Sequence, residues 1–438
     1  MKGLKVGIIG AGRSGMAAAR FLRRLGARVL LSERGRIHGP LPKGIDVETG
    51  KHSSRLLDSD LIIRSPGIPG HLPILKKITR RGIPVWSELE LASRYARFKE
   101  LIAITGTNGK TTATTLVGEF FKTTKNPTFV VGNIGTPLSD VALRTTAKSN
   151  VVVEVSSYQL ENIRTFHPTV SCILNITPDH LEHHGTMKAY ASAKARIFEN
   201  QTPEDVCVLN ADDASCRRLA THCRAKLFWF SRRQKLKSGI YLDGNDVVIR
   251  WNKINSRWPL RSNLPGPHNV ENILASVAMA VAGGVTFKGI RRVLSTFKGV
   301  EHRLEWVRTL RGARYINDSK ATNVDSTRVA LASFPGPLII IMGGEGKGSP
   351  YAPLRSLIKS RVKRILLIGE DAPQIEKELR GAAPMERLGT LTKAVLRASQ
   401  VAERDDVVLL SPACASFDQY RNYEERGREF KALVRKLA

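Results

Sequence analysis

The sequence has few cysteines and no long apolar run. Its five cysteines are an odd number without a CxxC pair, so neither a disulfide framework nor a zinc ribbon is indicated. No apolar stretch approaches the roughly 20 residues that cross a bilayer, and glycines interrupt the apolar start of MKGLKVGIIGAGRSGM. We therefore expect a cytoplasmic protein without membrane insertion.

Acidic residues are the scarcer charged class. The 69 Lys and Arg against 39 Asp and Glu give a net charge of +30, which fits either a nucleic-acid binder or an enzyme with polyanionic ligands. The basic residues are spread along the whole chain and form no basic tail. We therefore expect no nucleic-acid partner, and the charge itself stays unexplained.

Strand-like and helix-like segments alternate along the chain, which predicts an α/β fold with three domains. The first ninety residues have the rhythm of a Rossmann-like parallel sheet, a second strand series begins near Leu101, and a third follows the loop at 297–302. We predict an N-terminal Rossmann-like domain (1–91), a central P-loop ATPase-type domain with a parallel sheet (92–298) and a C-terminal Rossmann-like domain (299–438).

A glycine-rich turn follows the strand LIAIT and resembles a P-loop. Backbone N–H groups of such a turn bind phosphate oxygens, its lysine pairs with the β and γ phosphates, and its hydroxyl reaches Mg²⁺. Two residues, not the usual four, separate its glycines, and a purely structural glycine turn is the alternative. The residues are Gly106, Thr107, Asn108, Gly109, Lys110, Thr111 and Thr112.

Two further residues could complete a metal site beside this loop. Glu154 stands in the apolar strand VVVEVSSYQLE, where a carboxylate without a cation is costly to bury. His180 follows the next strand, and with Glu154 and Thr111 it would make a Mg²⁺ or Mn²⁺ set. Spacing alone leaves His180 equally a structural histidine, and we expect His183 and His184 at the surface.

The N-terminal strand KVGIIG leads into GAGRSG, which could hold a pyrophosphate at a helix N-terminus. About 20 residues later, Glu33 ends the second predicted strand, where an NAD enzyme places its ribose-binding acid. From these residues alone a dehydrogenase stays open, as does a P-loop ATPase acting on nucleic acid.

Eight blocks distributed over nearly the whole chain resemble, in their order, the Mur ligase family. They are GTNGKTT, EVSSYQLE, NITPDHLEHHG, YASAKARIFEN, GPHNVENILAS, EHRLE, NDSKATN and SPACASFDQY. The last two resemble the branch that adds D-glutamate. A dehydrogenase would leave GTNGKTT unexplained, and a nucleic-acid motor would not need the tail SPACASFDQY. A sister ligase adding another amino acid, or a folylpolyglutamate-type synthase, is the remaining alternative.

The resemblance implies a monomeric ligase that joins D-glutamate to UDP-N-acetylmuramoyl-L-alanine through an acyl phosphate made with ATP. It implies two Mg²⁺ ions, with Mn²⁺ as an alternative, held by Thr111, Glu154, His180 and a carbamate on Lys194. Lys110, Lys194, His180 and Glu154 would form the catalytic set. Without the family, Lys194 would be one of many solvated basic residues.

The resemblance also assigns the ligand-binding residues. Besides the P-loop, the nucleotide would contact Asn269, Asn272, His302, Arg303, Asp318 and Lys320. The N-terminal domain would bind the UDP end of the substrate. The predicted UDP-substrate contacts are Gly12, Arg13, Ser14, Glu33, Arg34, Ser65 and Gly67, with Asn133 of the central domain. D-glutamate would contact Thr322, Lys347, Ser416, Phe417 and Tyr423.

Overall fold

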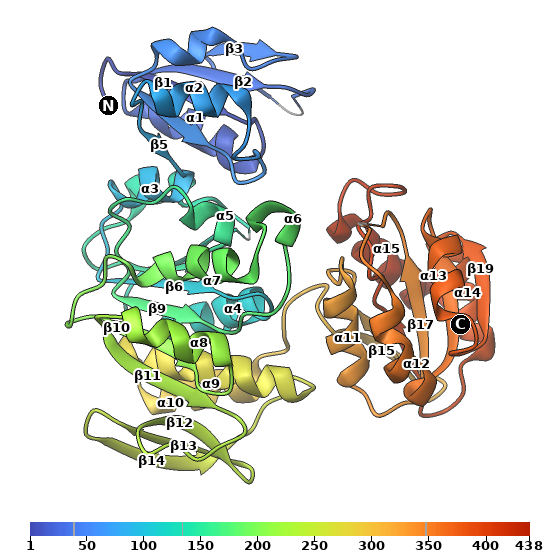
Figure 1. The fold of residues 1–438 in the computed structure, drawn as a ribbon. Coiled ribbons are helices and arrows are strands. Elements are labelled where there is room, and N and C mark those ends of the chain that lie inside the picture. Colours follow the sequence, from blue (N-terminus) through green and yellow to red (C-terminus); the bar gives the residue numbers. More distant parts are fainter. Residues whose placement is uncertain (38–39, 134, 347) are drawn as a thin grey trace. The chain divides into compact units, whose positions relative to one another are not determined.

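The computed structural model describes residues 1–37, 40–133, 135–346 and 348–438 and contains three α/β sheets (Figure 1). They fall into two compact units, one of residues 1–261 with 271–295 and one of residues 262–270 with 296–438. The three-sheet α/β architecture is as predicted, while the boundaries at 91 and 298 stay a prediction. Among the described residues, no helix has the length and apolar character that crossing a membrane requires.

The first sheet is parallel, with the order β3-β2-β1-β4-β5. Its strands are β1 (Lys5–Ile9), β2 (Arg28–Glu33), β3 (Asp46–Thr49), β4 (Leu61–Arg64) and β5 (Val85–Trp86). The associated helices are α1 (Arg13–Arg24), the short η1 (Ser54–Asp58), α2 (Pro73–Arg80) and α3 (Glu88–Ser93). The strand order reverses between β1 and β4, and in such sheets ligands bind beyond the carboxyl ends of the strands at this point.

The second sheet has nine strands in the order β14-β13-β12-β11-β10-β9-β6-β8-β7. They are β6 (Glu100–Thr105), β7 (Thr128–Gly132), β8 (Asn150–Glu154), β9 (Val170–Ile173), β10 (Val206–Asn210), β11 (Lys226–Ser231), β12 (Gly239–Asp243), β13 (Asp246–Trp251) and β14 (Ile254–Pro259). The predicted parallel pairing holds from β7 to β12.

The antiparallel pairing of β12, β13 and β14 was not predicted, so the second sheet is mixed. Its physical basis is in the turns. Gly244 between β12 and β13 has φ 61°, and Asn252 and Lys253 between β13 and β14 have φ 43° and 69°. Two successive residues with positive φ make a tight hairpin that returns the chain beside itself.

Helices follow the strands of the second sheet from residue 110 to residue 296. They are α4 (Lys110–Lys122), α5 (Ser157–Leu160), α6 (Leu181–His184), α7 (Met187–Ala195), α8 (Ala214–Leu219), α9 (Pro267–Ala282) and α10 (Phe287–Thr296). Short 3₁₀ turns are η2 (Leu138–Asp140), η3 (Ala142–Arg144), η4 (Arg196–Phe198) and η5 (Ala220–His222).

The third sheet has the order β15-β16-β20-β17-β18-β19, and β15 alone among its strands is antiparallel to its neighbour. Its strands are β15 (Glu305–Leu310), β16 (Ala313–Asn317), β17 (Leu338–Gly343), β18 (Val362–Ile368), β19 (Met385–Gly389) and β20 (Val407–Leu410). Its helices are α11 (Val324–Ala332), η6 (Ala352–Leu354), α12 (Arg355–Arg361), α13 (Ala372–Leu379), α14 (Leu391–Val401) and α15 (Tyr423–Lys436).

Strand β17 explains why the third sheet is covered on both faces. Its sequence LIIIMG is buried at every position. Leu338, Ile340 and Met342 pack into one apolar cluster, while Ile339 and Ile341 pack into another. Alternate side chains of a strand point to opposite faces, so a continuous apolar run requires a core on each side.

Candidate active site

The P-loop lies between β6, which ends at Thr105, and α4, which begins at Lys110, as the sequence predicted. Gly109 has φ 85°, a left-handed conformation that favours glycine. A Cβ atom built on Gly109 would lie 2.1 Å from Oδ1 of Asn272, so no larger residue fits this position without movement. Two residues of the predicted nucleotide set, Gly109 and Asn272, are thus neighbours.

Two lysines converge on the loop. Lys110 Nζ donates to the carbonyl oxygens of Gly106 at 2.8 Å and Thr107 at 2.7 Å, and Lys194 Nζ donates to the same Gly106 oxygen at 2.9 Å. Lys194 is 1% exposed. Burial and the nearby charge of Lys110 hold the pKa of Lys194 well below its usual value. The solvated position that composition alone suggested for Lys194 is therefore wrong.

Asn175, which the sequence analysis missed, fastens the P-loop to the segment after β9. Its carbonyl oxygen accepts from Thr107 N at 3.0 Å, its Oδ1 accepts from Asn108 N at 2.9 Å, and its Nδ2 donates to Asn108 O at 3.1 Å. The available signal was a polar residue shortly after a buried strand, with Leu174 between β9 and Asn175. Asn175 therefore fixes the conformation of the P-loop.

Glu154 is the last residue of β8 and is 1% exposed. Its Oε1 accepts from Asn133 Nδ2 at 2.9 Å, whereas its buried Oε2 has no hydrogen-bond partner among the described residues. Buried carboxylate oxygens are normally satisfied. Glu154 pairs with Ile104 of β6, so the carboxylate lies at the sheet edge from which the P-loop emerges, and its orphan oxygen is suited to a cation.

A cavity of about 960 Å³ lies over this edge. It brings together five residues that the sequence predicted, Gly67, Lys110, Asn133, His180 and Lys194, and it is also lined by the loop 66–71. His180 has φ 53° and directly precedes α6. Glu154 does not line the cavity, and Thr111 and Thr112 are buried at the start of α4.

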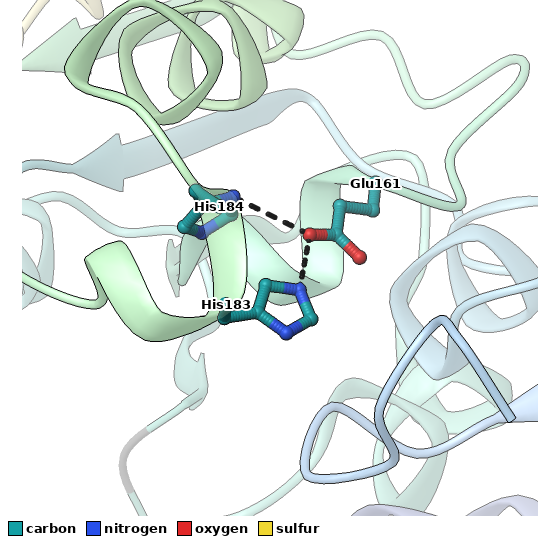
Figure 2. Close-up of side chains that lie close together, drawn as sticks. All are labelled: Glu161, His183 and His184. Atoms are coloured by element: carbon teal, nitrogen blue, oxygen red, sulfur yellow. Dashed lines mark hydrogen bonds and ion pairs between the residues drawn. The ribbon is translucent and has the colours of Figure 1, made fainter.

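The expected surface position of His183 and His184 is wrong. Figure 2 shows both rings directed at the carboxylate of Glu161. His183 Nε2 lies 2.6 Å from Glu161 Oε1, and His184 Nδ1 lies 3.6 Å from the same oxygen. The side chain of His184 is only 4% exposed, because the ring of Tyr158 packs beside both imidazoles.

The N-terminal glycine loop is closed by Glu33, the last residue of β2. Its Oε2 accepts from Ala11 N at 2.7 Å and its Oε1 from Gly35 N at 2.8 Å. Partial burial opposes ionisation, but these backbone donors outweigh it and lower the pKa of Glu33. The carboxylate therefore shapes the loop through contacts within the protein, which is a different role from the ribose contact considered for a dehydrogenase.

Other predicted UDP-binding residues follow the carboxyl ends of β1, β2 and β4. Ser65 follows β4, and its Oγ donates to Gly10 O at 2.9 Å, tying the ends of β1 and β4 together. Gly12, Arg13 and Arg34 are exposed, and Ser14 is half-buried. Gly12, Arg13 and Arg34 therefore remain accessible beside the sheet, while Ser65 is buried.

In the second unit, the predicted nucleotide residues Asp318 and Lys320 follow the end of β16, while His302 and Arg303 precede β15. Asp318 accepts from Leu304 N at 3.2 Å and from Ser411 Oγ at 2.9 Å. Its burial raises the pKa to about 7, although Arg303 opposes the shift. His302 is buried, with Nδ1 2.9 Å from Asn317 Nδ2. The predicted Asn269 donates to Pro265 O at 2.7 Å.

The predicted amino-acid contacts follow the carboxyl ends of β16 and β20, whose last residues pair. Thr322 is half-buried, Ser416 is buried, and Phe417 is 68% exposed. The ring of Tyr423 lies 5.4 Å from Nζ of Lys320, which was predicted to contact the nucleotide. The predicted Lys347 lies outside the described residues.

Arg426, on α15, is a further residue that the sequence analysis missed. This 1% exposed guanidinium donates to Ser319 Oγ at 3.1 Å, Ser319 O at 2.9 Å, Ala415 O at 3.1 Å and Cys414 O at 3.2 Å. Burial lowers the pKa of Arg426 to about 10, so it stays charged. It joins the two segments that carry Lys320 and Ser416.

Comparison with known families covers all three sheets. The model of the Mur ligase MurD-like N-terminal domain matches residues 4–87, that of the Mur ligase middle domain matches 104–280, and that of the Mur ligase glutamate ligase domain matches 302–414.

Curated relatives match over their full length. The chain is 46% identical over 448 residues to the UDP-N-acetylmuramoylalanine--D-glutamate ligase of Koribacter versatilis, covering 100% of this chain and 98% of the relative. It is 42% identical over 448 residues to the ligase of the same name from Clostridioides difficile, covering 100% and 99%.

Solved structures share the fold. The UDP-N-acetylmuramate-alanine ligase of Thermotoga maritima superposes with a TM-score of 0.61 at 20% identity, covering 99% of each chain. A pseudomurein peptide ligase from Methanothermus fervidus gives 0.61 at 19% identity, covering 99% of this chain and 100% of that one.

Proposed function

This chain belongs to the Mur ligase family, and from that membership we propose that it joins D-glutamate to UDP-N-acetylmuramoyl-L-alanine in peptidoglycan precursor synthesis. The curated relatives that support this substrate pair carry it in their names. The observation that carries the chemistry is the convergence of Lys110, Lys194 and Glu154 on the sheet edge below the P-loop.

The proposed reaction begins with the carboxylate of the UDP-linked substrate. A carboxylate is a poor acylating agent, so its oxygen first attacks the γ-phosphorus of ATP, releasing ADP and giving an acyl phosphate. The amine of D-glutamate then attacks the carbonyl carbon, phosphate leaves, and the amine loses a proton. Lys110 and the loop N–H groups stabilise the charge that develops on the phosphoryl oxygens, while Asn175 holds the loop in position.

Magnesium fits the residues present, because Glu154 Oε2 is a buried oxygen without a partner among the described residues and carboxylates are preferred ligands of this hard ion. Glu154, His180, Thr111 and a carbamate on Lys194 would hold two ions, with Mn²⁺ as the alternative. Bound there, the ions would neutralise phosphate charge. The lowered pKa of Lys194 favours the neutral amine, which is the form that adds carbon dioxide and releases a proton.

The second unit supplies the amino-acid site in this proposal. Thr322, Lys347, Ser416, Phe417 and Tyr423 would receive D-glutamate, with His302, Arg303, Asp318, Lys320, Asn269 and Asn272 near the nucleotide. The charged Arg426 behind this site favours a dicarboxylate. The UDP-linked substrate would bind near Gly12 and Ser65 of the N-terminal sheet and near Asn133, which follows β7 of the second sheet.

The remaining assignments belong to the same proposal. The domains would span 1–91, 92–298 and 299–438, and the enzyme would act as a monomer without a nucleic-acid partner. Because the proposed reaction uses ATP and a UDP-linked sugar, we place it in the cytoplasm.

The proposal is tested by phosphate release from ATP with UDP-N-acetylmuramoyl-L-alanine present. D-glutamate, L-glutamate, D-aspartate, L-lysine and diaminopimelate are compared as acceptors. Release that depends on D-glutamate is expected. Release with another amino acid would move the chain to a sister activity, and no release with any acceptor would overturn the proposal. The matched variant K110A should release no phosphate while still binding the UDP-linked substrate.

A further inference from the structure

The last residue of β4, Arg64, is a buried cation beside the cavity. It is 7% exposed. Its Nε and Nη2 donate to Ile68 O at 2.9 and 2.6 Å, and its Nη1 donates to Glu161 Oε2 at 3.0 Å. Arg64 therefore folds the cavity-lining loop 66–71 back onto the strand and fastens it to a carboxylate that follows β8.

The other oxygen of this carboxylate faces α6. Figure 2 shows His183 and His184 approaching Glu161 Oε1, at 2.6 and 3.6 Å. His184 is fixed from its other side, since its Nε2 lies 2.9 Å from Ser157 Oγ. Both histidines belong to the turn that begins directly after His180. Glu161 thus connects the loop 66–71, through Arg64, with α6, which begins directly after His180.

These three side chains could also be read as a metal site, because their ligand atoms lie within 4.8 Å of one another. Two contacts argue for the hydrogen-bonded role. The negative charge of Glu161 is already paired with the guanidinium of Arg64. A metal ion bound to the other oxygen of Glu161 would be repelled by that guanidinium. The second nitrogen of His184 is engaged with Ser157. No oxygen of Glu161 is left without a partner, in contrast to Glu154.

We propose that Glu161 is a positioning residue that keeps the loop 66–71 in register with His180 and thereby sets the affinity for the UDP-linked substrate. The inference rests on the proposed function, in which Gly67 of this loop and Ser65, directly before it, contact the UDP-linked substrate. Charge-assisted bonds of this kind are directional, and they are strong when partly removed from water. Loss of the charge on Glu161 frees the loop without touching the P-loop, which Asn175 holds separately.

The test is E161Q, which keeps the shape of the side chain and removes its charge. A matched control is D140N, because Arg20 donates to both oxygens of Asp140 at 3.0 and 3.1 Å and so links α1 to η2, away from the cavity lining. E161Q should raise KM for the UDP-linked substrate about tenfold, as expected for a lost charge-assisted bond. KM for ATP should stay within about twofold, and D140N should leave both unchanged.

Further variants keep the inference falsifiable if E161Q folds poorly. R64M should raise the same KM. The KM of the double variant R64M/E161Q should not exceed that of the more damaging single variant, because both substitutions remove the same bond between Arg64 and Glu161. Additive effects, an unchanged KM in E161Q, or an equal rise in D140N would overturn the proposal. So would tight binding of Zn²⁺ alone that E161Q abolishes, since the cluster would then be a metal site.

The proposed function can fail separately from this inference. If the wild-type enzyme releases no phosphate with D-glutamate, the reaction is wrong. Calorimetric binding of the UDP-linked substrate to wild type, E161Q and D140N still measures the positioning role, and equal affinities would overturn it.

Discussion

Lys194 in the first unit and Arg426 in the second are both 1% exposed, yet their surroundings differ in kind. Lys194 has one carbonyl oxygen at 2.9 Å and the ring of Tyr190 at 4.5 Å, with Lys110 close enough to disfavour its charge. Arg426 makes four hydrogen bonds to neutral oxygens of two segments.

The difference separates a reactive group from a structural one. A buried lysine with few partners is destabilised as a cation and is readily converted to the neutral amine. A guanidinium with donors fixed in a plane stays charged and holds its acceptors in place. Burial alone therefore does not predict the role of a basic side chain. The number and direction of its hydrogen-bond acceptors decide whether it stays charged.

The largest effect is expected from Lys194. K194A removes the amine that we propose to carry a carbamate, so kcat should fall by at least about a thousandfold, measured as phosphate release at saturating substrates. Formate or acetate should restore part of the activity to K194A by occupying the vacated space. K194R should be as inactive as K194A but should gain nothing from either anion. Rescue of both variants by these anions, or of neither, would contradict a carbamate on Lys194.

Substitution of Arg426 should change KM for D-glutamate, whereas substitution of Lys194 changes kcat. R426M leaves the oxygens of Ser319, Ala415 and Cys414 without their donor, so KM for D-glutamate should rise about a hundredfold. R426K retains the charge but has a different donor geometry, and a rise of about tenfold is expected. A thermal melt of each variant provides the folding control. Equal effects of R426M and R426K on this KM would mean that the charge contributes nothing and that only the donor geometry of the guanidinium matters.

Asp318 extends the comparison to a buried acid. Its folded pKa of about 7 lies above the value near 3.9 of an unfolded chain, so the native state holds the proton more tightly. Asp318 therefore contributes less stability as pH rises towards 7. Relative to D318N, the wild-type protein should lose about 1 kcal/mol of unfolding free energy between about pH 6 and pH 8. Parallel stability curves for the two proteins would contradict this.

The smallest effect concerns the ring beside Lys194. Tyr190 OH lies 3.2 Å from Thr107 Oγ1 and ties α7 to the P-loop. Y190F keeps the ring contact with Lys194 but removes this bond, and kcat/KM for ATP should fall about threefold. A much larger loss would show that the hydroxyl, rather than the ring, is what Lys194 requires.

The parts that the sequence predicted are those whose partners are near in the chain. The P-loop is one contiguous turn, and Glu154 was recognisable because an acid interrupts an apolar strand. Asn175, Glu161 and Arg426 were missed because their contacts join distant segments, as Arg426 and Ser319 do across 107 positions. The hairpins of β12–β14 had a local signal in the turn Asp-Gly-Asn that the sequence analysis did not use.

The burial of Lys194 illustrates a second limit. Its hydrogen bond to Gly106 spans 88 positions, and nothing in the local sequence marks it off from the other basic residues. Only the family resemblance identified Lys194 as special. The structure adds the physical reason: the Lys194 amine is buried beside the charge of Lys110, and both lower its pKa.

The unpredicted hairpins also affect how the chain behaves at high concentration. Strand β14 pairs with β13 alone and forms the open edge of the nine-stranded sheet. Arg257 on this strand pairs with Asp243 at 3.0 Å and Asp246 at 2.7 Å, and Pro259 ends it without a donor. Charged side chains and proline on an edge discourage pairing with another chain. These features protect this edge of the sheet against aggregation.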